Sequence, residues 1–290
     1  LQLANTYPTC RTEQLTASAF QRPIRTLTIG NGTRKVLYTA AHHANEWITA
    51  LVLLKFAEEL ASAIQSGGRI FGVPGQTLYQ AATIYMVPMV DPDGVDLVVG
   101  AIRPGDIQYD LAQRLAQDYP AIPFPEGWKA NLLGVDLNLQ YPAGWLQARE
   151  IKFSQGFTTP GPRDYVGRAP LNQLESRALA DYTSYIDPAL VLAYHSQGRE
   201  IYWQFQDYEV PGARELGEEF ARLSGYTLTE VPYNSSFAGY KDWFIQQFKR
   251  PGYTIEVGEG VNPLPLEQFD RIYGDNLGIL TTAATGMPDI

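Results

Sequence analysis

The sequence predicts an α/β fold whose mixed, mostly parallel sheet is covered by helices on both faces. Short apolar runs of strand length alternate along the chain with longer segments in which apolar residues recur every three or four positions. Strands separated by helices form mainly parallel sheets, and such sheets are buried on both faces. Hydrophobic residues make up 45% of the chain, and no linker, repeat or low-complexity segment divides it. We therefore expect one domain over residues 1–290.

The first elements are expected to be two strands, residues 24–30 and 33–41, joined as a hairpin by a tight Asn31-Gly32 turn. A helix then follows Asn45, which is a good N-cap. Apolar residues at helical spacing give this helix one buried stripe, made of Leu53, Phe56, Ala57, Leu60 and Ile64.

Segments that contain Gly and Pro predict the turns and loops that separate the elements that follow. Residues 66–76 predict a loop, residues 83–90 a buried strand ended by the turn residues 91–94, residues 106–119 a surface helix, and residues 119–170 long loops. The remaining chain predicts a helix over 170–186, strands over 188–196 and 198–203, a helix over 210–225, a strand over 252–257 and a closing helix over 265–284.

Composition narrows the classes of partner. The formal net charge of −9 argues against a nucleic acid or an anionic membrane as partner, because both require a basic face. No apolar run approaches the roughly 20 residues of a membrane span. Residues 1–20 lack the order of a secretion signal, and the opening Leu1 is compatible with removal of a leader or an upstream module. Cys10, the only cysteine, excludes an internal disulfide framework and a Cys-rich metal site; compartment and oligomeric state stay open.

Polar side chains stand at the ends of three predicted strands. His42, His43 and Glu46 follow the second strand, His195 follows PALVLAY, and Glu256 lies within GYTIEV. Ligands of open α/β sheets gather where strands end, so these side chains are expected to converge.

Two histidines and a glutamate form a set that zinc accepts, and a catalytic zinc keeps three protein ligands plus water. His43 and Glu46 stand three residues apart at a strand-to-helix corner, and His195 would come from a distant strand. Local sequence leaves open whether His42 is the ligand in place of His43. It also leaves open the reading that all of them are ordinary polar residues at strand ends.

Five motifs resemble those of the carboxypeptidase A-like zinc peptidases. They occur in the family's order over residues 40–258 and read HHANEWITA, VPMVDPDGVD, GVDLNLQYP, AYHSQG and GYTIEVG. The resemblance implies an eight-stranded mixed sheet with helices on both faces, and one zinc ion per chain.

The resemblance also implies roles for individual residues. His43, Glu46 and His195 would be the zinc ligands, and Glu256 would accept a proton from water and return it to the leaving amine. Asp136 would accept a hydrogen bond from the first histidine and fix its tautomer; a turn-capping role is the alternative.

The chain departs from the family at two arginines. Leu139 follows Asn138 where the exopeptidases carry the arginine that clamps the C-terminal carboxylate of the substrate. Lys129 is the only basic residue offered for support of the oxyanion, with apolar residues where a second arginine is expected. An exposed loop lysine is the competing interpretation.

Three segments resemble the bacterial γ-D-glutamyl-L-diamino acid endopeptidases: WKAN, GVDLNLQYPAGW and AGYKDWFI. The two missing arginines fit the same branch. The resemblance implies zinc-dependent cleavage of peptidoglycan stem peptides between γ-linked D-glutamate and meso-diaminopimelate. It places the protein at the bacterial cell wall or outside the cell, with muropeptide recycling in the cytoplasm as the alternative. Lys241 would favour an acidic side chain in the leaving-group pocket, unless it is a solvated helix residue. Tyr233 resembles a mobile tyrosine that closes over substrate, although packing is a competing role.

Two other functions compete with this one. A metallocarboxypeptidase or amidohydrolase could use Arg163 or Arg199 as its carboxylate clamp. An inactive cell-wall-binding module could keep the fold, although such a module has no need of Glu256.

Overall fold

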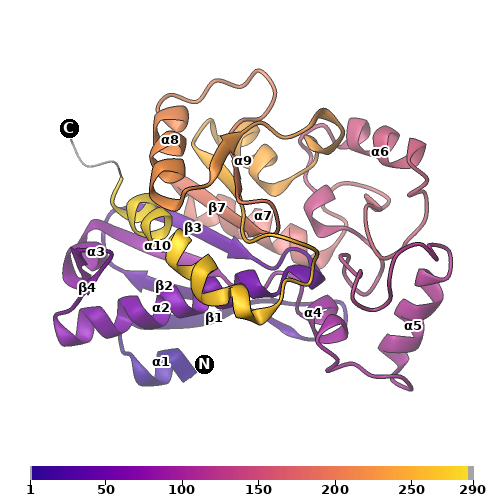
Figure 1. Cartoon of the computed structure of the whole chain (residues 1–290), viewed down its shortest axis with the longest axis horizontal. Helices are drawn as coiled ribbons and strands as arrows, with labels where there is room; N and C mark the ends of the chain where they lie inside the picture. Colours follow the sequence, from indigo (N-terminus) through magenta and orange to yellow (C-terminus); the bar gives the residue numbers. More distant parts are fainter. Residues whose placement is uncertain (1, 287–290) are drawn as a thin grey trace.

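An eight-stranded mixed sheet runs through the computed structural model, which describes residues 2–286 (Figure 1). In sheet order the strands are β1 (Cys10–Ala17), β2 (Pro23–Gly30), β6 (Ala82–Val87), β3 (Arg34–Ala40), β7 (Leu190–His195), β10 (Gly252–Glu256), β8 (Glu200–Tyr202) and β9 (Thr227–Thr229). The central strands β6, β3, β7 and β10 are parallel, whereas β1–β2, β2–β6 and β10–β8 are antiparallel. The predicted fold class is therefore confirmed.

Helices cover both faces because successive residues of the central strands point to opposite sides. Val36 and Tyr38 of β3 join one core cluster, and Leu37 joins the other. The first cluster is covered by α2 (Ile48–Ser66), α3 (Gly75–Ala81), α8 (Ala213–Ser224) and α10 (Phe269–Thr285), with α1 (Gln2–Thr6) at its margin. The second is covered by α6 (Trp145–Ser154), α7 (Leu174–Ile186) and α9 (Tyr240–Phe248).

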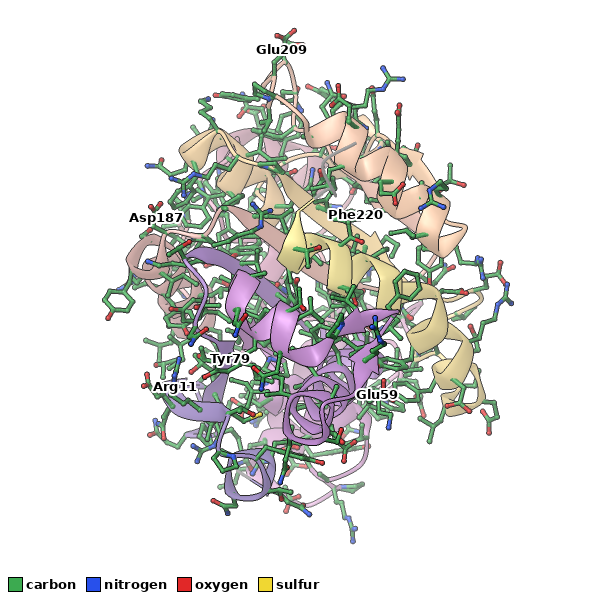
Figure 2. The ribbon with its side chains drawn as sticks, turned by 90° about the vertical axis from the view of Figure 1, so that its left-hand side faces the viewer. Arg11, Glu59, Tyr79, Asp187, Glu209 and Phe220 are labelled. Carbon is green, nitrogen blue, oxygen red and sulfur yellow. The ribbon has the colours of Figure 1, made fainter. Side chains whose placement is uncertain are left out.

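The side chains follow this layering. Figure 2 shows Phe220 of α8 among the packed side chains, where it is fully buried, while Asp187 and Glu209 lie at the surface. The predicted stripe of α2 is buried along its whole length. The predicted helices over 106–119, 170–186, 210–225 and 265–284 correspond to α5 (Ile107–Ala116), α7, α8 and α10. Within residues 2–286 no helix has the length and apolar character needed to cross a membrane.

The predicted hairpin is wrong, because β6 lies between the two strands it would join. Leu27 of β2 pairs with Met86 in antiparallel register, and Val36 of β3 pairs with Ile84 in parallel register. The turn glycines make room for this third strand: a Cβ on Gly32 would lie 2.3 Å from a backbone atom of residue 81. The Asn-Gly pair thus allows a close backbone approach instead of a two-residue turn.

The N-cap prediction is also wrong. Asn45 lies inside a 3-10 turn, η1 (Ala44–Glu46), and α2 begins only at Ile48. The residues 91–94 do not simply end a strand: Asp91 accepts a hydrogen bond from the Gly94 N–H at 3.1 Å and so caps α4 (Pro92–Val98).

Some helices and strands lie in segments for which the sequence predicted loops or for which no element was predicted. Residues 66–76 contain a two-stranded ribbon, β4 (Arg69–Ile70) and β5 (Val73–Pro74), and the start of α3. Residues 119–170 contain α6 and a 3-10 turn, η2 (Leu137–Leu139). The elements α1, β1 and β9 were not expected either, and α9 was expected only as the helix of the competing interpretation of Lys241.

Candidate metal centre

The carboxyl ends of β3, β7 and β10 meet at one edge of the sheet. Parallel pairing places Ala40 of β3 beside Tyr194 of β7, and Glu256 of β10 beside His195 of β7. The chain leaves β3 at Ala40 and reaches His43 three residues later. Three segments far apart in the sequence therefore deliver polar side chains to one place, as the strand-end pattern predicts.

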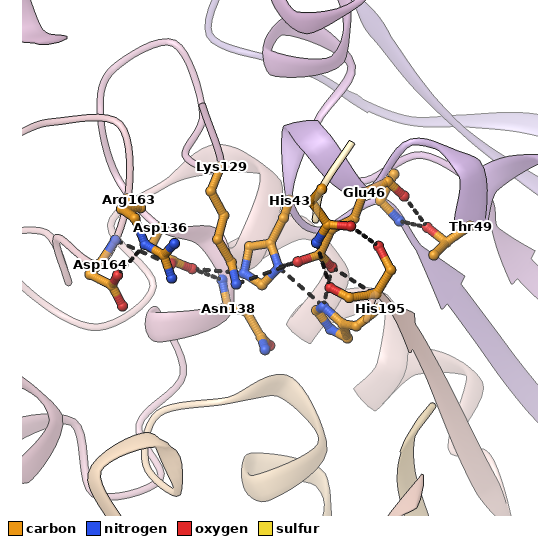
Figure 3. Close-up of polar contacts among 12 residues, drawn as sticks. His43, Glu46, Thr49, Lys129, Asp136, Asn138, Arg163, Asp164 and His195 are labelled. Carbon is orange, nitrogen blue, oxygen red and sulfur yellow. Dashed lines mark hydrogen bonds and ion pairs between the residues drawn. The ribbon is translucent and has the colours of Figure 1, made fainter. Parts of the chain in front are cut away.

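Three buried side chains converge there. Nδ1 of His43 lies 2.9 Å from Oε1 of Glu46, Nδ1 of His195 lies 2.9 Å from Oε2 of Glu46, and the two Nδ1 atoms are 3.1 Å apart (Figure 3). The three residues are at most 4% exposed, and one ligand atom from each lies within 4.8 Å of the others. Two imidazole nitrogens and a carboxylate form the donor set of a zinc site, so these residues could bind one metal ion.

His43, and not His42, is the first histidine of this cluster. The His42 ring stacks on that of His195 at a centroid distance of 5.3 Å, and neither of its nitrogens joins the cluster. Burial holds the pKa of His42 well below its usual value. His42 is therefore a neutral ring packed behind the site.

The strand-to-helix corner is fixed by Thr49. Its hydroxyl donates to the Glu46 carbonyl oxygen at 2.7 Å and accepts from the Ala41 N–H at 3.0 Å. Ala41 has a positive φ of 47°, which turns the chain sharply at the end of β3. The corner then presents His43 and Glu46 to the same point, which the three-residue spacing alone did not guarantee.

Asp136 orients His43. Nε2 of His43 lies 3.0 Å from Oδ1 of Asp136, and the same oxygen accepts from the Asn138 N–H at 3.1 Å. The side chain thus both caps η2 and pairs with the histidine. Burial opposes ionisation of Asp136, but His43 and Lys129 outweigh it and hold its pKa below its usual value. In neutral His43, a carboxylate on Nε2 keeps the single proton on that nitrogen, so that Nδ1 is the nitrogen available to a metal.

Lys129 lies beside the cluster. Its Nζ is 3.4 Å from Oε1 of Glu46, and its side chain is 23% exposed and lines the cavity. It is not the exposed loop lysine of the competing interpretation. Burial opposes ionisation of Glu46, but the charges of His43 and Lys129 hold its pKa well below its usual range. Glu46 is accordingly ionised, which a carboxylate that binds a metal must be.

Glu256 lines the same cavity but does not belong to the cluster of His43, Glu46 and His195. Desolvation by the cavity wall, together with the charge of Glu46, raises the pKa of Glu256 to about 8. Glu200 pairs with Glu256 across the β8–β10 ladder, and its charge raises that pKa further. A carboxyl with a pKa near neutrality is suited to accept and return a proton.

The cavity holds about 280 Å³ and contains most of the expected substrate-binding residues. Asn138, Arg163 and Lys241 line it, and so does Leu139 at the position of the family's arginine clamp. Lys241 is buried, with its ammonium 2.5 Å from both the Asp242 carboxylate and the Gln204 carbonyl oxygen, so it is not a solvated helix residue.

Two expected residues lie outside the cavity wall. Tyr233 is exposed and packs edge-to-face on Phe237, which lines the cavity. The Arg199 guanidinium pairs with Asp275 at 3.0 Å and covers the Tyr226 ring. The structure therefore does not bring Arg199 to the site, and Tyr233 stands only beside its rim.

Sequence reasoning missed Lys152 and Asp164, which line the cavity as an ion pair of 2.7 Å. Lys152 lies on the buried face of α6 with Trp145 and Ala148. A lysine at helical spacing from an apolar stripe was the signal that could have found it. Asp164 comes from a loop and carried no such signal.

Comparison with known proteins agrees with this geometry. Residues 1–277 match the sequence model of a family described as zinc carboxypeptidase. The chain is 43% identical to γ-D-glutamyl-L-diamino acid endopeptidase 1 of Lysinibacillus sphaericus over 278 residues, covering 96% of this chain and 68% of the relative. It is 38% identical to the uncharacterized protein YqgT of Bacillus subtilis (strain 168), covering 97% of this chain and 74% of that protein.

Solved structures share the fold at low identity. Bovine thrombin-activatable fibrinolysis inhibitor superposes with a TM-score of 0.73 at 16% identity, covering 98% of this chain and 92% of that one. Murein-tripeptide amidase MpaA of Escherichia coli O157 gives a TM-score of 0.58 at 18% identity, covering 96% and 93%. On the family match and the sequence relatives, with the same fold and a buried His-Glu-His cluster, the chain belongs to the zinc carboxypeptidase family and is a zinc-dependent peptidase.

Proposed function

We propose that the chain hydrolyses the bond between γ-linked D-glutamate and meso-diaminopimelate in peptidoglycan stem peptides, and that residues 1–290 form one catalytic domain. The observation that carries the proposal is Leu139 in the cavity wall, beside a complete set of metal-binding side chains and Glu256. An apolar side chain there cannot clamp a C-terminal carboxylate, whereas an endopeptidase substrate need not present one. The name of the 43%-identical relative gives the same bond class.

The metal-binding roles are assigned to His43, Glu46 and His195, with Nδ1 of each histidine as the ligand atom. Zinc held there supplies Lewis-acid activation of water and of the substrate carbonyl. Asp136 holds His43 in the tautomer that leaves Nδ1 unprotonated.

Glu256 is the proposed proton carrier. It accepts a proton from the attacking water and gives it to the nitrogen of the leaving amine, so one group serves both halves of the reaction. Its raised pKa supports this role, because a carboxyl of ordinary acidity returns a proton poorly at neutral pH. Lys129 is proposed to stabilise negative charge on the substrate carbonyl oxygen, which its position beside Glu46 supports.

Lys241 is proposed to select the leaving group. Its ammonium lies in the cavity wall, where it favours the carboxylate at the far end of diaminopimelate over the ammonium of lysine at the same stem position. Asn138 shapes the same wall, since its side-chain oxygen accepts from the Tyr240 N–H at 2.9 Å. Tyr233 is proposed to fold over bound substrate from the exposed segment beside the rim.

A metallocarboxypeptidase or amidohydrolase is the second candidate, because Arg163 lines the cavity and could act as a different clamp. Side-by-side digestion separates the two. We expect the zinc-loaded protein to cleave a muropeptide stem at the γ-glutamyl bond, and to leave intact an α-linked peptide with a free C-terminus. Preferential release of the C-terminal residue from the second peptide would overturn the proposal.

A further inference from the structure

Three cations share one wall of the cavity, and one carboxylate lies between two of them. Lys152 reaches Oδ1 of Asp164 at 2.7 Å, and Nε of Arg163 reaches Oδ2 of the same carboxylate at 2.6 Å. Lys129 is the third cation on this wall. Figure 3 shows Arg163, Asp164 and Asp136 on one side of His43, with the Lys129 side chain between them and Glu46.

Around Asp164, two cations face a single carboxylate, so their positive charge is only partly compensated. Asp136 is engaged by His43, and Asp164 serves both Lys152 and Arg163. Within residues 2–286, Arg163 makes its hydrogen bond through Nε, and its terminal nitrogens have no protein partner. Its side chain is 43% exposed while it lines the cavity. The guanidinium is therefore held at its base by Asp164, with its outer donors accessible to a ligand.

The pairing with Asp164 also compensates the charge of the buried Lys152. Lys152 is 8% exposed, and a buried ammonium is retained only when it is paired. The Asp164 N–H faces Oδ2 of Asp136 at 3.4 Å, which links the loop to the residue that orients His43. Asp136 thus links the cationic wall to the metal centre.

We infer that Arg163, supported by Lys152 through Asp164, binds the free α-carboxylate of the γ-glutamyl residue; this inference rests on the proposed function. A glutamate joined through its side chain keeps its α-carboxylate, which the α-carbon and the side-chain methylenes separate from the scissile carbonyl. An α-linked residue without an acidic side chain has no carboxylate in the corresponding region. A guanidinium recognises a carboxylate through two parallel hydrogen bonds, so this wall favours a γ-linked glutamyl residue over a residue that has no carboxylate there.

The test compares two stem tripeptides that differ only at this carboxylate: L-alanyl-γ-D-glutamyl-meso-diaminopimelate and its analogue with the glutamyl α-carboxylate converted to an amide. Charge-assisted hydrogen bonds predict a kcat/KM roughly 10- to 100-fold higher for the carboxylate form. Arg163→Gln should lower this ratio at least severalfold. Arg214→Gln is the matched control, because it makes the same change of charge at an exposed α8 residue paired with Glu218, and it should keep the wild-type ratio.

Equal cleavage of both stems by the wild type, or an unchanged ratio in Arg163→Gln, would overturn the inference and leave the proposed function standing. A loss of cleavage that follows amidation of the C-terminal carboxylate instead would also overturn it, since Arg163 would then be a C-terminal clamp. Failure to cleave either stem at the γ-glutamyl bond would remove the proposed function and the inference together.

Discussion

Replacing Lys241 by methionine should unfold the protein at a lower temperature as well as change its specificity. The Lys241 ammonium lies 2.5 Å from Oδ1 of Asp242 and 2.5 Å from the Gln204 carbonyl oxygen, and the lysine and aspartate side chains are 3% and 5% exposed. Methionine removes one partner of a buried ion pair and leaves the Asp242 carboxylate uncompensated.

Breaking a buried pair from one side costs about 3–5 kcal/mol. For a chain of this length each kcal/mol corresponds to roughly 2–4 °C in Tm, so Lys241→Met should melt roughly 10 °C below the wild type. Adding Asp242→Asn should recover most of the loss, because asparagine is neutral and keeps an acceptor for the Gly239 N–H that caps α9.

Calorimetry of the zinc-loaded wild type, single variant and double variant measures the stability effect. The folded double variant then serves for specificity, with kcat/KM determined on stems carrying diaminopimelate or lysine. Asp242 already offsets part of the Lys241 charge, so we expect a wild-type preference near the lower end of about 10- to 100-fold. A Tm within about 2 °C of wild type for Lys241→Met would refute the buried-pair reasoning. An unchanged preference in the double variant would remove Lys241 from substrate selection.

Three further predictions concern the metal centre. Glu256→Gln should keep its zinc but lose at least about 10²–10⁴-fold in kcat; zinc analysis with kinetics checks both, and wild-type turnover would disprove the role. His43→Ala and His195→Ala should each lose zinc, whereas His42→Ala should retain it. Measurement of the zinc content of the three variants checks this. If His42→Ala alone were metal-free, the ligand assignment would be reversed. Glu200→Gln should move the acidic limb of the kcat/KM profile to lower pH, because the Glu200 charge raises the pKa of Glu256 and activity requires its ionised form; a limb that stays in place or moves to higher pH would contradict this coupling.

The convergence at the sheet edge could be predicted because the ends of strands are local properties of the sequence, and the carboxyl ends of parallel strands meet at one edge of a sheet. His195 and Glu256 end neighbouring parallel strands, so the alternation of strands and helices was sufficient to bring them together. The choice between His42 and His43 required the structure, since it depends on the turn at Ala41 and on the hydrogen bonds of Thr49.

The pairing of β2 with β6 could not be predicted, because it depends on backbone contacts between segments distant in sequence. Gly30 and Gly32 admit the backbone of residues 81–82, and nothing near the Asn-Gly pair reveals this neighbour. The cationic wall was missed for a similar reason. Lys152 and Arg163 meet only through Asp164, which joins a helix hidden in a Pro- and Gly-rich stretch to a loop.

Hydrolysis of L-alanyl-γ-D-glutamyl-meso-diaminopimelate by the zinc-loaded protein, in water labelled with heavy oxygen, tests the proposed activity most directly. Mass spectrometry of the products should show free diaminopimelate and L-alanyl-D-glutamate, with the heavy oxygen in the γ-carboxyl of the glutamate. Removal of the metal with a chelator should abolish both products, and zinc should restore them. An intact γ-glutamyl bond after prolonged incubation, with label incorporated instead where the L-alanyl–D-glutamyl bond is cut, would contradict the proposed activity.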